Sequence, residues 1–222
     1  MTNVVEAPPE VAVLSADSAA ALVAGGLVPY RVTVAKYEEM ARHGVLGPGD
    51  KVELLHGMLA SKMTLHTPHT YATVRLDRVL ESLCGRKWCV RSQQPVTASD
   101  DSMPEPDLSV AQGCMDDYLE RHPTAEQTAL VVEVSDSSLR LDLGVKLALY
   151  AAALIPEYWV VDLPGRRLLV HTLPRGGKTP GYRGVAVLGI DDTVPLTLRG
   201  ESFGAIRVGD FLPPLPNQVG SS

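Results

Sequence analysis

Three charged residues in the middle of the chain have the types and the setting that phosphodiester hydrolysis needs. Glu133 interrupts the apolar run ALVVEVS, and a carboxylate inside such a run is costly unless a cation receives it. Asp107 lies 26 residues earlier in PEPDLSV, just before another apolar run, and Lys146 lies 13 residues after Glu133. Carboxylate oxygens suit Mg²⁺ or Mn²⁺, which would polarise the scissile phosphate and activate a water molecule. The set therefore predicts a divalent-metal site, with Lys146 orienting that water or stabilising charge on the phosphate.

The residues alone leave a second explanation open for Lys146. Asp142 lies four residues before it, and an acid and a base at this spacing on a helix commonly form a salt bridge. A helix that starts where a strand ends also brings its first turns back across that end, and a long lysine side chain can then reach the strand. Both a site role and a plain salt bridge are consistent with the spacing.

The elements that must position these residues follow from the apolar pattern. The Val-rich run from Ala129, bounded by Ser-Asp-Ser-Ser, predicts a buried strand. The next stretch predicts a helix, because Ser137 or Ser138 can cap it, Asp142 lies near its positive end and no proline occurs before Pro156. Glu133 is therefore expected in the strand and Lys146 in the helix.

The rest of the chain alternates between helical and extended patterns. VAKYEEMARHG predicts a helix that stops at Gly44, and His69 to Leu83 predicts a second helix. KVELLHGMLASKM predicts a hairpin around His56-Gly57, and EYWVVDLPGRRLLVHTL predicts another around Leu163-Pro164-Gly165. Residues 114–128 predict a loop with a short helix, and five further segments predict strands: WCVRSQQPVTA, LSVAQG, GYRGVAVLG, DTVPLTLRG and FGAIRV. This order predicts an α/β (α+β) fold with a mixed central sheet.

Length and composition set the outer limits of the interpretation. The 222 residues suffice for one sizeable core, with an N-terminal extension over residues 1–30, a domain over residues 31–212 and a tail over residues 213–222. Three cysteines do not make a disulfide framework. The chain lacks the pattern of a secretory signal and a run of transmembrane length, so we expect a cytoplasmic protein without membrane association.

Three segments taken together resemble the Uma2 family of restriction-endonuclease-like proteins: VELLHG, PEPDLSV and VVEVSDSSLRLDLGVKLALYAAALIPEYWVVD. The resemblance covers roughly Val34 to Leu212. It implies the PD-(D/E)xK nuclease fold, a mixed central sheet flanked by helices, here with extra hairpins. It also implies Asp107 as the acid of the first half-motif and Glu133 as the acid of the second, with Mg²⁺ or Mn²⁺ as the cofactor and the Val134 backbone carbonyl as a further ligand.

The chain departs from the superfamily pattern two residues after Glu133, where Ser135 replaces the usual lysine. The family is thought to carry that lysine in the following helix, which implies Lys146.

Three more residues enter through the resemblance or through their positions. Glu53 stands where the family carries an acid, so the resemblance implies it as a further metal ligand, and the alternative is an edge-strand carboxylate in solvent. Gln93 is a candidate for a hydrogen bond near the site or for a strand cap. His69, with His66 in the same HTPH segment, is a candidate for the substrate groove, and the alternative is helix capping or solvent exposure.

Two functions from different classes remain open from the sequence. The first is an Mg²⁺-dependent endonuclease that hydrolyses DNA as a homodimer, with Asp107, Glu133 and Lys146 as catalytic residues. The second is a catalytically silent dimer of the same fold that binds nucleic acid or a protein. The net charge of −6 argues mildly against sequence-independent nucleic-acid binding, although charge can be segregated to one face.

Overall fold

The computed structural model describes residues 23–47, 49–62 and 66–214. By their internal contacts, residues 1–31 form one unit and residues 32–222 a second unit. Residues 1–22 of the predicted extension and residues 215–222 of the predicted tail lie outside the described residues. The sheet, its helices and the candidate site residues all belong to the second unit.

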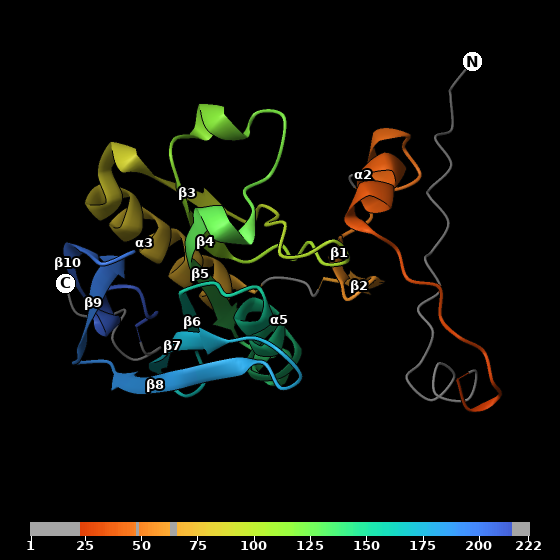
Figure 1. Ribbon diagram of the computed structural model, residues 1–222. Helices are drawn as coiled ribbons and strands as arrows, with labels where there is room; N and C mark the ends of the chain where they lie inside the picture. Colours follow the sequence, from red (N-terminus) through yellow and green to blue (C-terminus); the bar gives the residue numbers. More distant parts are fainter. Residues whose placement is uncertain (1–22, 48, 63–65, 215–222) are drawn as a thin grey trace, which may run out of the picture. The chain divides into compact units, whose positions relative to one another are not determined.

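A six-stranded mixed sheet forms the centre of the second unit (Figure 1). Its strands, in spatial order, are β3 (Trp88–Ser92), β4 (Leu108–Gln112), β5 (Thr128–Ser135), β6 (Glu157–Asp162), β7 (Arg167–Arg175) and β8 (Gly181–Gly189). β5 and β6 run parallel, and the other neighbours run antiparallel. The expectation of a mixed sheet is confirmed.

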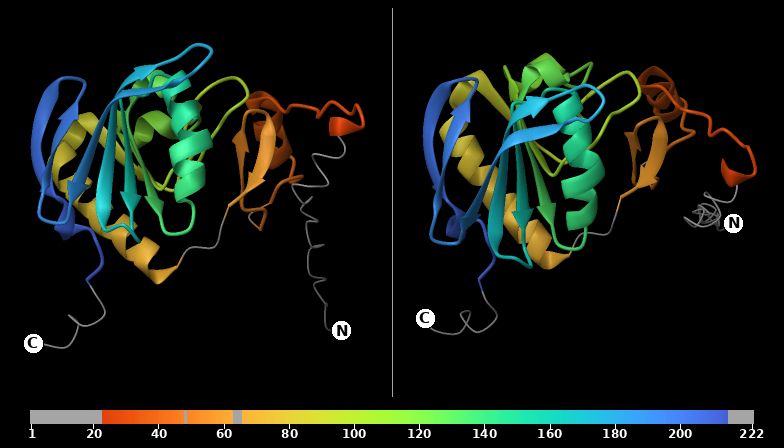
Figure 2. Two further views of the ribbon diagram at one scale, coloured as in Figure 1. Left: turned by 90° about the horizontal axis from the view of Figure 1, so that it is seen from below. Right: turned by 60° about the horizontal axis from the view of Figure 1, so that its bottom comes forward.

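Different helices cover the two faces of the sheet (Figure 2). On one face, α3 (Thr67–Cys84) and the hairpin of β9 (Thr193–Leu198) and β10 (Glu201–Arg207) build the larger core. On the other face, α5 (Leu147–Ala152) packs through Leu149 and Tyr150. Because β5 is covered on both faces, all of its side chains are buried, and its sequence is a nearly continuous apolar run rather than an alternating one.

Glu133 belongs to the α5 face of the sheet. Side chains alternate along a strand, and Val132 and Val134 lie in the core under α3 while Val131 lies in the core under α5. Glu133 therefore points toward the segment that carries Lys146 and Tyr150. This placement explains why a buried strand tolerates a carboxylate at that position.

The predicted hairpins are present. β1 (Val52–Leu55) and β2 (Met58–Ser61) pair around His56 and Gly57, whose φ angles of 50° and 74° are those of a tight hairpin turn. β6 and β7 pair across the turn after Asp162, which accepts the Gly165 amide. α2 (Val34–Arg42) is followed by Gly44 with a φ of 71°. Short 3₁₀ turns at Met115–Tyr118 and Ala125–Gln127 occupy the predicted loop.

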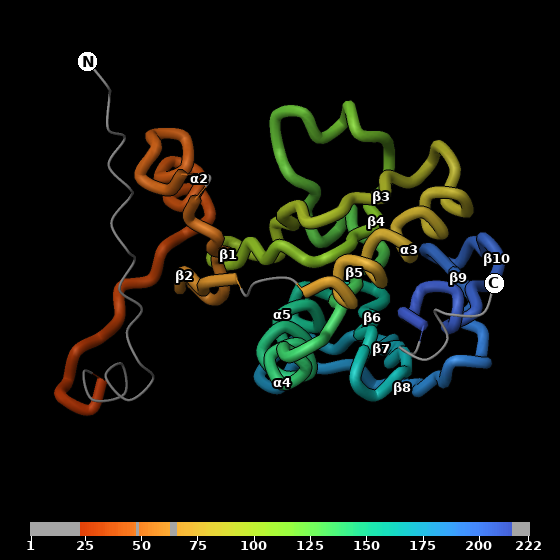
Figure 3. The backbone as a smooth tube through the Cα atoms, turned by 180° about the vertical axis from the view of Figure 1, so that it is seen from behind, coloured from red at the N-terminus to blue at the C-terminus, as the bar shows by residue number. Residues whose placement is uncertain are grey.

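The helix after β5 differs from the expectation of one regular helix. It consists of a turn, α4 (Leu139–Leu141), a π-helical turn at Asp142–Lys146, and α5, which Figure 3 shows as neighbouring coils of one segment. Ser138 occupies the cap position, but its hydroxyl donates to the Asp142 carboxylate instead of accepting a backbone N–H. π turns occur frequently at functional sites.

Three smaller features concern the start of α3, the cysteines and the length and polarity of the helices. α3 begins at Thr67, two residues before the predicted start, with His66 at its cap position and no side-chain capping bond. Cys84, Cys89 and Cys114 are free. Among the described residues, every helix is too short or too polar to span a membrane.

Candidate active site

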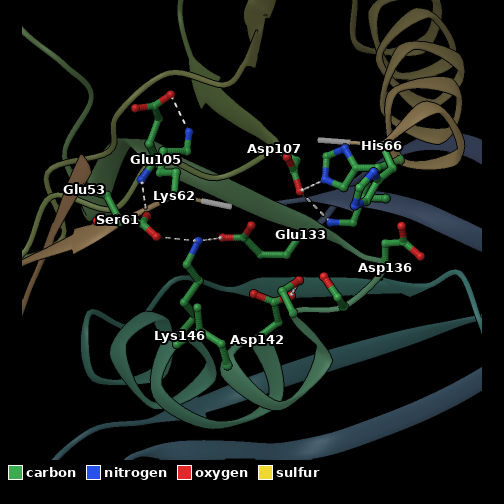
Figure 4. Close-up of a pocket in the computed structure, with 15 residues that line it drawn as sticks. Glu53, Ser61, Lys62, His66, Glu105, Asp107, Glu133, Asp136, Asp142 and Lys146 are labelled. Atoms are coloured by element: carbon green, nitrogen blue, oxygen red, sulfur yellow. Dashed lines mark hydrogen bonds and ion pairs between the residues drawn. The ribbon is translucent and has the colours of Figure 1, made fainter. Parts of the chain in front are cut away.

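The predicted acids and the predicted lysine meet in one pocket at the end of β5 (Figure 4). Leu108 of β4 pairs with Val132 of β5, so one step further along the two strands places Asp107 beside Glu133. Lys146 reaches the pocket from the π turn, and Glu53 reaches it from β1. Four segments far apart in the sequence thus supply one polar cluster.

Lys146 is buried between two glutamates. Its Nζ lies 3.0 Å from Glu133 Oε1 and 3.1 Å from Glu53 Oε1, and the residue is 5% exposed. Asp142 instead accepts hydrogen bonds from the hydroxyls of Ser135 (2.7 Å) and Ser138 (2.5 Å). The alternative of a salt bridge between Asp142 and Lys146 is therefore wrong.

Burial and charge together set the protonation of this cluster. Burial raises the pKa of Glu133 well above its usual range, an effect that the charge of Lys146 opposes. Burial lowers the pKa of Lys146, but attraction to Glu133, Glu53 and Asp142 outweighs it and holds that pKa above its ordinary value. Burial also raises the pKa of Asp142, although two hydroxyl donors oppose the rise. Lys146 is thus a fixed positive charge in the pocket.

Asp107 and Glu133, the acids of the two predicted half-motifs, are each anchored through one carboxylate oxygen. Glu133 Oε1 accepts from Lys146 Nζ and, at 2.8 Å, from the Tyr150 hydroxyl. Asp107 Oδ2 accepts from the Val134 amide at 2.7 Å and lies 3.1 Å from His69 Nε2. Within the described part of the chain, Glu133 Oε2 and Asp107 Oδ1 have no hydrogen-bond partner. Both acids are oriented, and each keeps one oxygen for a ligand.

The Val134 carbonyl faces the same side of β5 as Asp107. In an extended strand, the N–H and C=O of one residue point to the same side, and those of the next residue to the other. The Val134 amide donates to Asp107, whereas the Ser135 carbonyl accepts from Leu163 after β6. The orientation suits the predicted role of the Val134 carbonyl as a ligand.

His69 and Glu53 both lie inside the pocket. His69 is buried on α3, with Thr73 Oγ1 3.4 Å from its Nδ1 and Asp107 on the other side of the ring. Glu53 is 4% exposed, and its Oε2 accepts the Glu105 amide at 3.0 Å. The alternatives of solvent exposure for these two residues are wrong.

Gln93 is not brought into the pocket. Its side chain is exposed, and its contribution is a backbone one: with a φ of 50°, its amide donates to the Asp107 carbonyl at 3.0 Å. The residue therefore holds the chain before β4 in place. A substrate-groove role of its side chain stays a prediction without support from this arrangement.

The donor set fits Mg²⁺ as proteins usually hold it. Among the described residues, no three His, Cys, Asp or Glu side chains form a complete metal cage. Mg²⁺ commonly binds through one or two carboxylates, keeps several waters and takes substrate oxygens as its other ligands. Two carboxylate oxygens and one carbonyl beside an open pocket meet this requirement.

Sequence reasoning missed two features of the pocket. One is Tyr150, and the other is the ion pair at the rim of the pocket, in which Lys62 Nζ lies 2.6 Å from Glu105 Oε1. Tyr150 follows Lys146 by four residues, so both lie on one side of the helix and approach Glu133. That spacing was the available signal for Tyr150. Lys62 gave no signal, because its position depends on how the β1–β2 hairpin meets the segment before β4.

Comparisons with known proteins give the family and the fold. The model of the Uma2 family, described as "Putative restriction endonuclease", matches residues 34–204. The chain belongs to the Uma2 family. Among solved structures, it is similar to a protein from Anabaena variabilis ATCC 29413 described as "a putative nuclease belonging to DUF820", with a TM-score of 0.60 and 15% identity, covering 81% of this chain and 97% of that chain. No curated protein matches.

The Uma2 assignment confirms the resemblance seen in the three sequence segments. The structural likeness supports the fold, and the expected restriction-endonuclease-like architecture is confirmed.

Proposed function

We propose that this Uma2 protein is an Mg²⁺-dependent endonuclease that hydrolyses DNA phosphodiester bonds. The observation that carries the proposal is the pair of oriented carboxylates, Asp107 and Glu133, each with one free oxygen beside the buried ammonium of Lys146. A purely structural ion pair would need only Glu133 and Lys146. Such an ion pair would not explain why Asp107 accepts from the Val134 amide and also contacts His69.

Each residue has a distinct role in the proposed site. Asp107, Glu133 and the Val134 carbonyl would hold Mg²⁺ or Mn²⁺, which supplies Lewis acidity toward the phosphate and its water. Lys146 presents a cation at a defined place, where it stabilises negative charge on the phosphate. Glu53 holds Lys146 from the side opposite Glu133. This placement favours a positioning role for Glu53 over the ligand role predicted for it.

The pocket admits a phosphate from its rim. Lys62, which is paired with Glu105, and His66 line it beside the acids, so one cation and one polar ring lie where the backbone would approach. Because the whole chain carries a net charge of −6, attraction to a nucleic-acid backbone must come from these few groups near the pocket. Binding should consequently be weak at physiological salt and should strengthen as salt is lowered.

The test is metal-dependent cleavage of plasmid and single-stranded DNA by the wild type and by Asp107→Asn, Glu133→Gln and Lys146→Ala. We expect cleavage with Mg²⁺ or Mn²⁺ that each substitution reduces at least about 100-fold. Asp136→Asn is the matched control, because Asp136 lines the pocket without a role in the proposed chemistry. Calorimetry should show metal binding that Asp107→Asn abolishes.

A catalytically silent binding module is the second candidate. The contact that favours it is the double ion pair of Lys146, which by itself stabilises the fold without any chemistry. Absence of cleavage, together with absence of Asp107-dependent metal binding, would contradict the nuclease and leave this second function.

A further inference from the structure

Tyr150 is a buried tyrosine whose hydroxyl ends at the candidate site. It lies on α5, its side chain is fully buried, and its ring packs against Tyr158 with 5.0 Å between the ring centroids. Its hydroxyl donates to Glu133 Oε1 at 2.8 Å. The roles proposed above for Asp107, Glu133 and Lys146 make no use of this hydroxyl.

Lys146 alone holds the Glu133 carboxylate only loosely. The lysine reaches Glu133 Oε1 through a flexible four-carbon stem, and its ammonium is shared with Glu53 Oε1 at 3.1 Å (Figure 4). The terminal torsion of a glutamate is broad, so one donor leaves the plane of the carboxylate free to turn. A second donor from another side chain restricts that plane.

Tyr150 is the stiffer of the two donors. A tyrosine side chain has two χ angles, and this ring is packed in the core under α5 with Val131 and Ile155. Tyr150 follows Lys146 by four residues, so the two donors come from one side of one helix. Both donors meet at Glu133 Oε1, which leaves Oε2 as the oxygen open to a ligand.

We propose that Tyr150 is a positioning residue of the metal site, whose hydroxyl fixes the plane of the Glu133 carboxylate so that Oε2 is ready to ligate Mg²⁺ or Mn²⁺. The inference rests on the proposed function, because it assigns the metal to this pocket. Groups that orient a metal ligand from behind typically contribute 10–100-fold to metal affinity. Tyr150 acts through Glu133 and not on the metal directly.

The competing explanation is a structural role. A buried tyrosine hydroxyl needs an acceptor, and Glu133 would serve only as that acceptor. Loss of the hydroxyl would then lower stability and leave metal affinity unchanged. Tyr182 offers the comparison, because its ring also packs against Tyr158, at 6.1 Å between centroids, and its hydroxyl donates at 2.9 Å to the carbonyl of Ile155, outside the set of residues that line the pocket.

The test is Mn²⁺ binding to the full chain, measured by electron paramagnetic resonance of the free ion during titration. We expect Tyr150→Phe to raise the Kd for Mn²⁺ at least about tenfold and Tyr182→Phe to leave it unchanged. Urea titrations should show similar, modest losses of stability in both variants, because each loses one hydroxyl hydrogen bond. Metal affinity is the readout that a structural role would not move.

Cleavage gives a second readout. The Mn²⁺ concentration for half-maximal DNA cleavage should shift in Tyr150→Phe by the same factor as the Kd. Saturating Mn²⁺ should restore most of the rate, because the substitution leaves Asp107, Glu133 and Lys146 in place. A rate that stays low at saturating Mn²⁺ would overturn a role confined to metal positioning.

Two further results would overturn the inference. One is an unchanged Kd in Tyr150→Phe, and the other is an equal loss of affinity in Tyr182→Phe, which would indicate an effect of core packing. A wild type that binds Mn²⁺ without cleaving DNA contradicts the nuclease and not the role of Tyr150, which the Kd alone decides. A wild type that binds no Mn²⁺ contradicts both. Circular dichroism confirms that each variant is folded.

Discussion

Lys146 determines the charge balance of the candidate site. It is the cation that contacts Glu133 and Glu53, all three residues are buried, and Tyr150 adds a hydrogen bond to Glu133. A buried ion pair contributes little net stability compared with apolar residues, but removal of one partner leaves an uncompensated charge. The cluster therefore depends on the lysine far more than an exposed pair would.

Substitution of Lys146 by methionine is expected to lower the free energy of unfolding by about 3–5 kcal/mol near neutral pH. The loss should shrink in mild acid, because the raised pKa of Glu133 lets that carboxyl take a proton in the folded state before it would in the unfolded chain. Stability of the variant therefore falls as pH rises from the ordinary glutamate range toward neutrality. Denaturant titrations at two pH values measure this.

The control for that substitution is Lys178→Met, which removes an exposed lysine and should change stability by less than about 0.5 kcal/mol. Glu133→Gln combined with Lys146→Met should recover part of the loss. Equal effects of the two single lysine substitutions would show that the buried ion pairs contribute nothing.

At the level of elements, the site follows from one register and one irregular helix. The pairing of β4 with β5 places Asp107 beside Glu133, and the π turn presents Lys146 to the same strand end. The sequence predicted these three residues, because the acid in an apolar run and the adjacent helix are local signals. It could not decide on Glu53, since the meeting of β1 with β5 depends on packing between distant segments.

The sequence could not predict the π turn either. Apolar spacing indicates a helix, but one extra residue in a turn changes the period too little to be recognised over so short a stretch. The cap prediction failed for a related reason: Ser138 has a competing acceptor in Asp142, which only the folded backbone brings within 2.5 Å. Ser138 therefore bonds to the Asp142 side chain instead of capping the helix.

Strand β7 carries a pH-sensitive group on the α5 face. His171 is buried between the rings of Tyr158 and Tyr182, and neither ring nitrogen has a hydrogen-bond partner in the described structure. Burial lowers the pKa of His171. Among the described residues, no carboxylate contacts the ring to stabilise an imidazolium, so the folded state favours the neutral form.

The folded protein should therefore lose stability as pH falls below about 6.5, the ordinary histidine pKa, where the unfolded chain binds a proton that His171 does not. The slope should be about 1.4 kcal/mol for each pH unit until the folded pKa is reached. His171→Phe should flatten this slope in urea titrations, whereas His43→Gln, at an exposed histidine, should leave it unchanged. Equal slopes in all three proteins would contradict the assignment.

At the scale of the whole molecule, the described residues of one chain bring the two acids and the lysine together in one pocket. Such a pocket can cut one strand of a DNA duplex at a time.

If the proposed function holds, plasmid cleavage should pass through a nicked circle before linear DNA appears. Each pocket would cut one strand independently, so concerted double-strand cleavage is not expected. Gel analysis of the time course measures the order of products. Linear DNA formed without a nicked intermediate would contradict this arrangement.

The β1–β2 hairpin owes part of its attachment to the same lysine. Leu54 of β1 packs with Val34 and Met103 in a small cluster, and Leu55 of β1 packs in the large core under α5. The ion pair from Glu53 to Lys146 adds a polar contact between the hairpin and the helix after β5. Local opening of the hairpin would withdraw Glu53 from the pocket and would also take Leu55 out of the core. The fraction of molecules that have Glu53 in the pocket then depends on how often the hairpin opens.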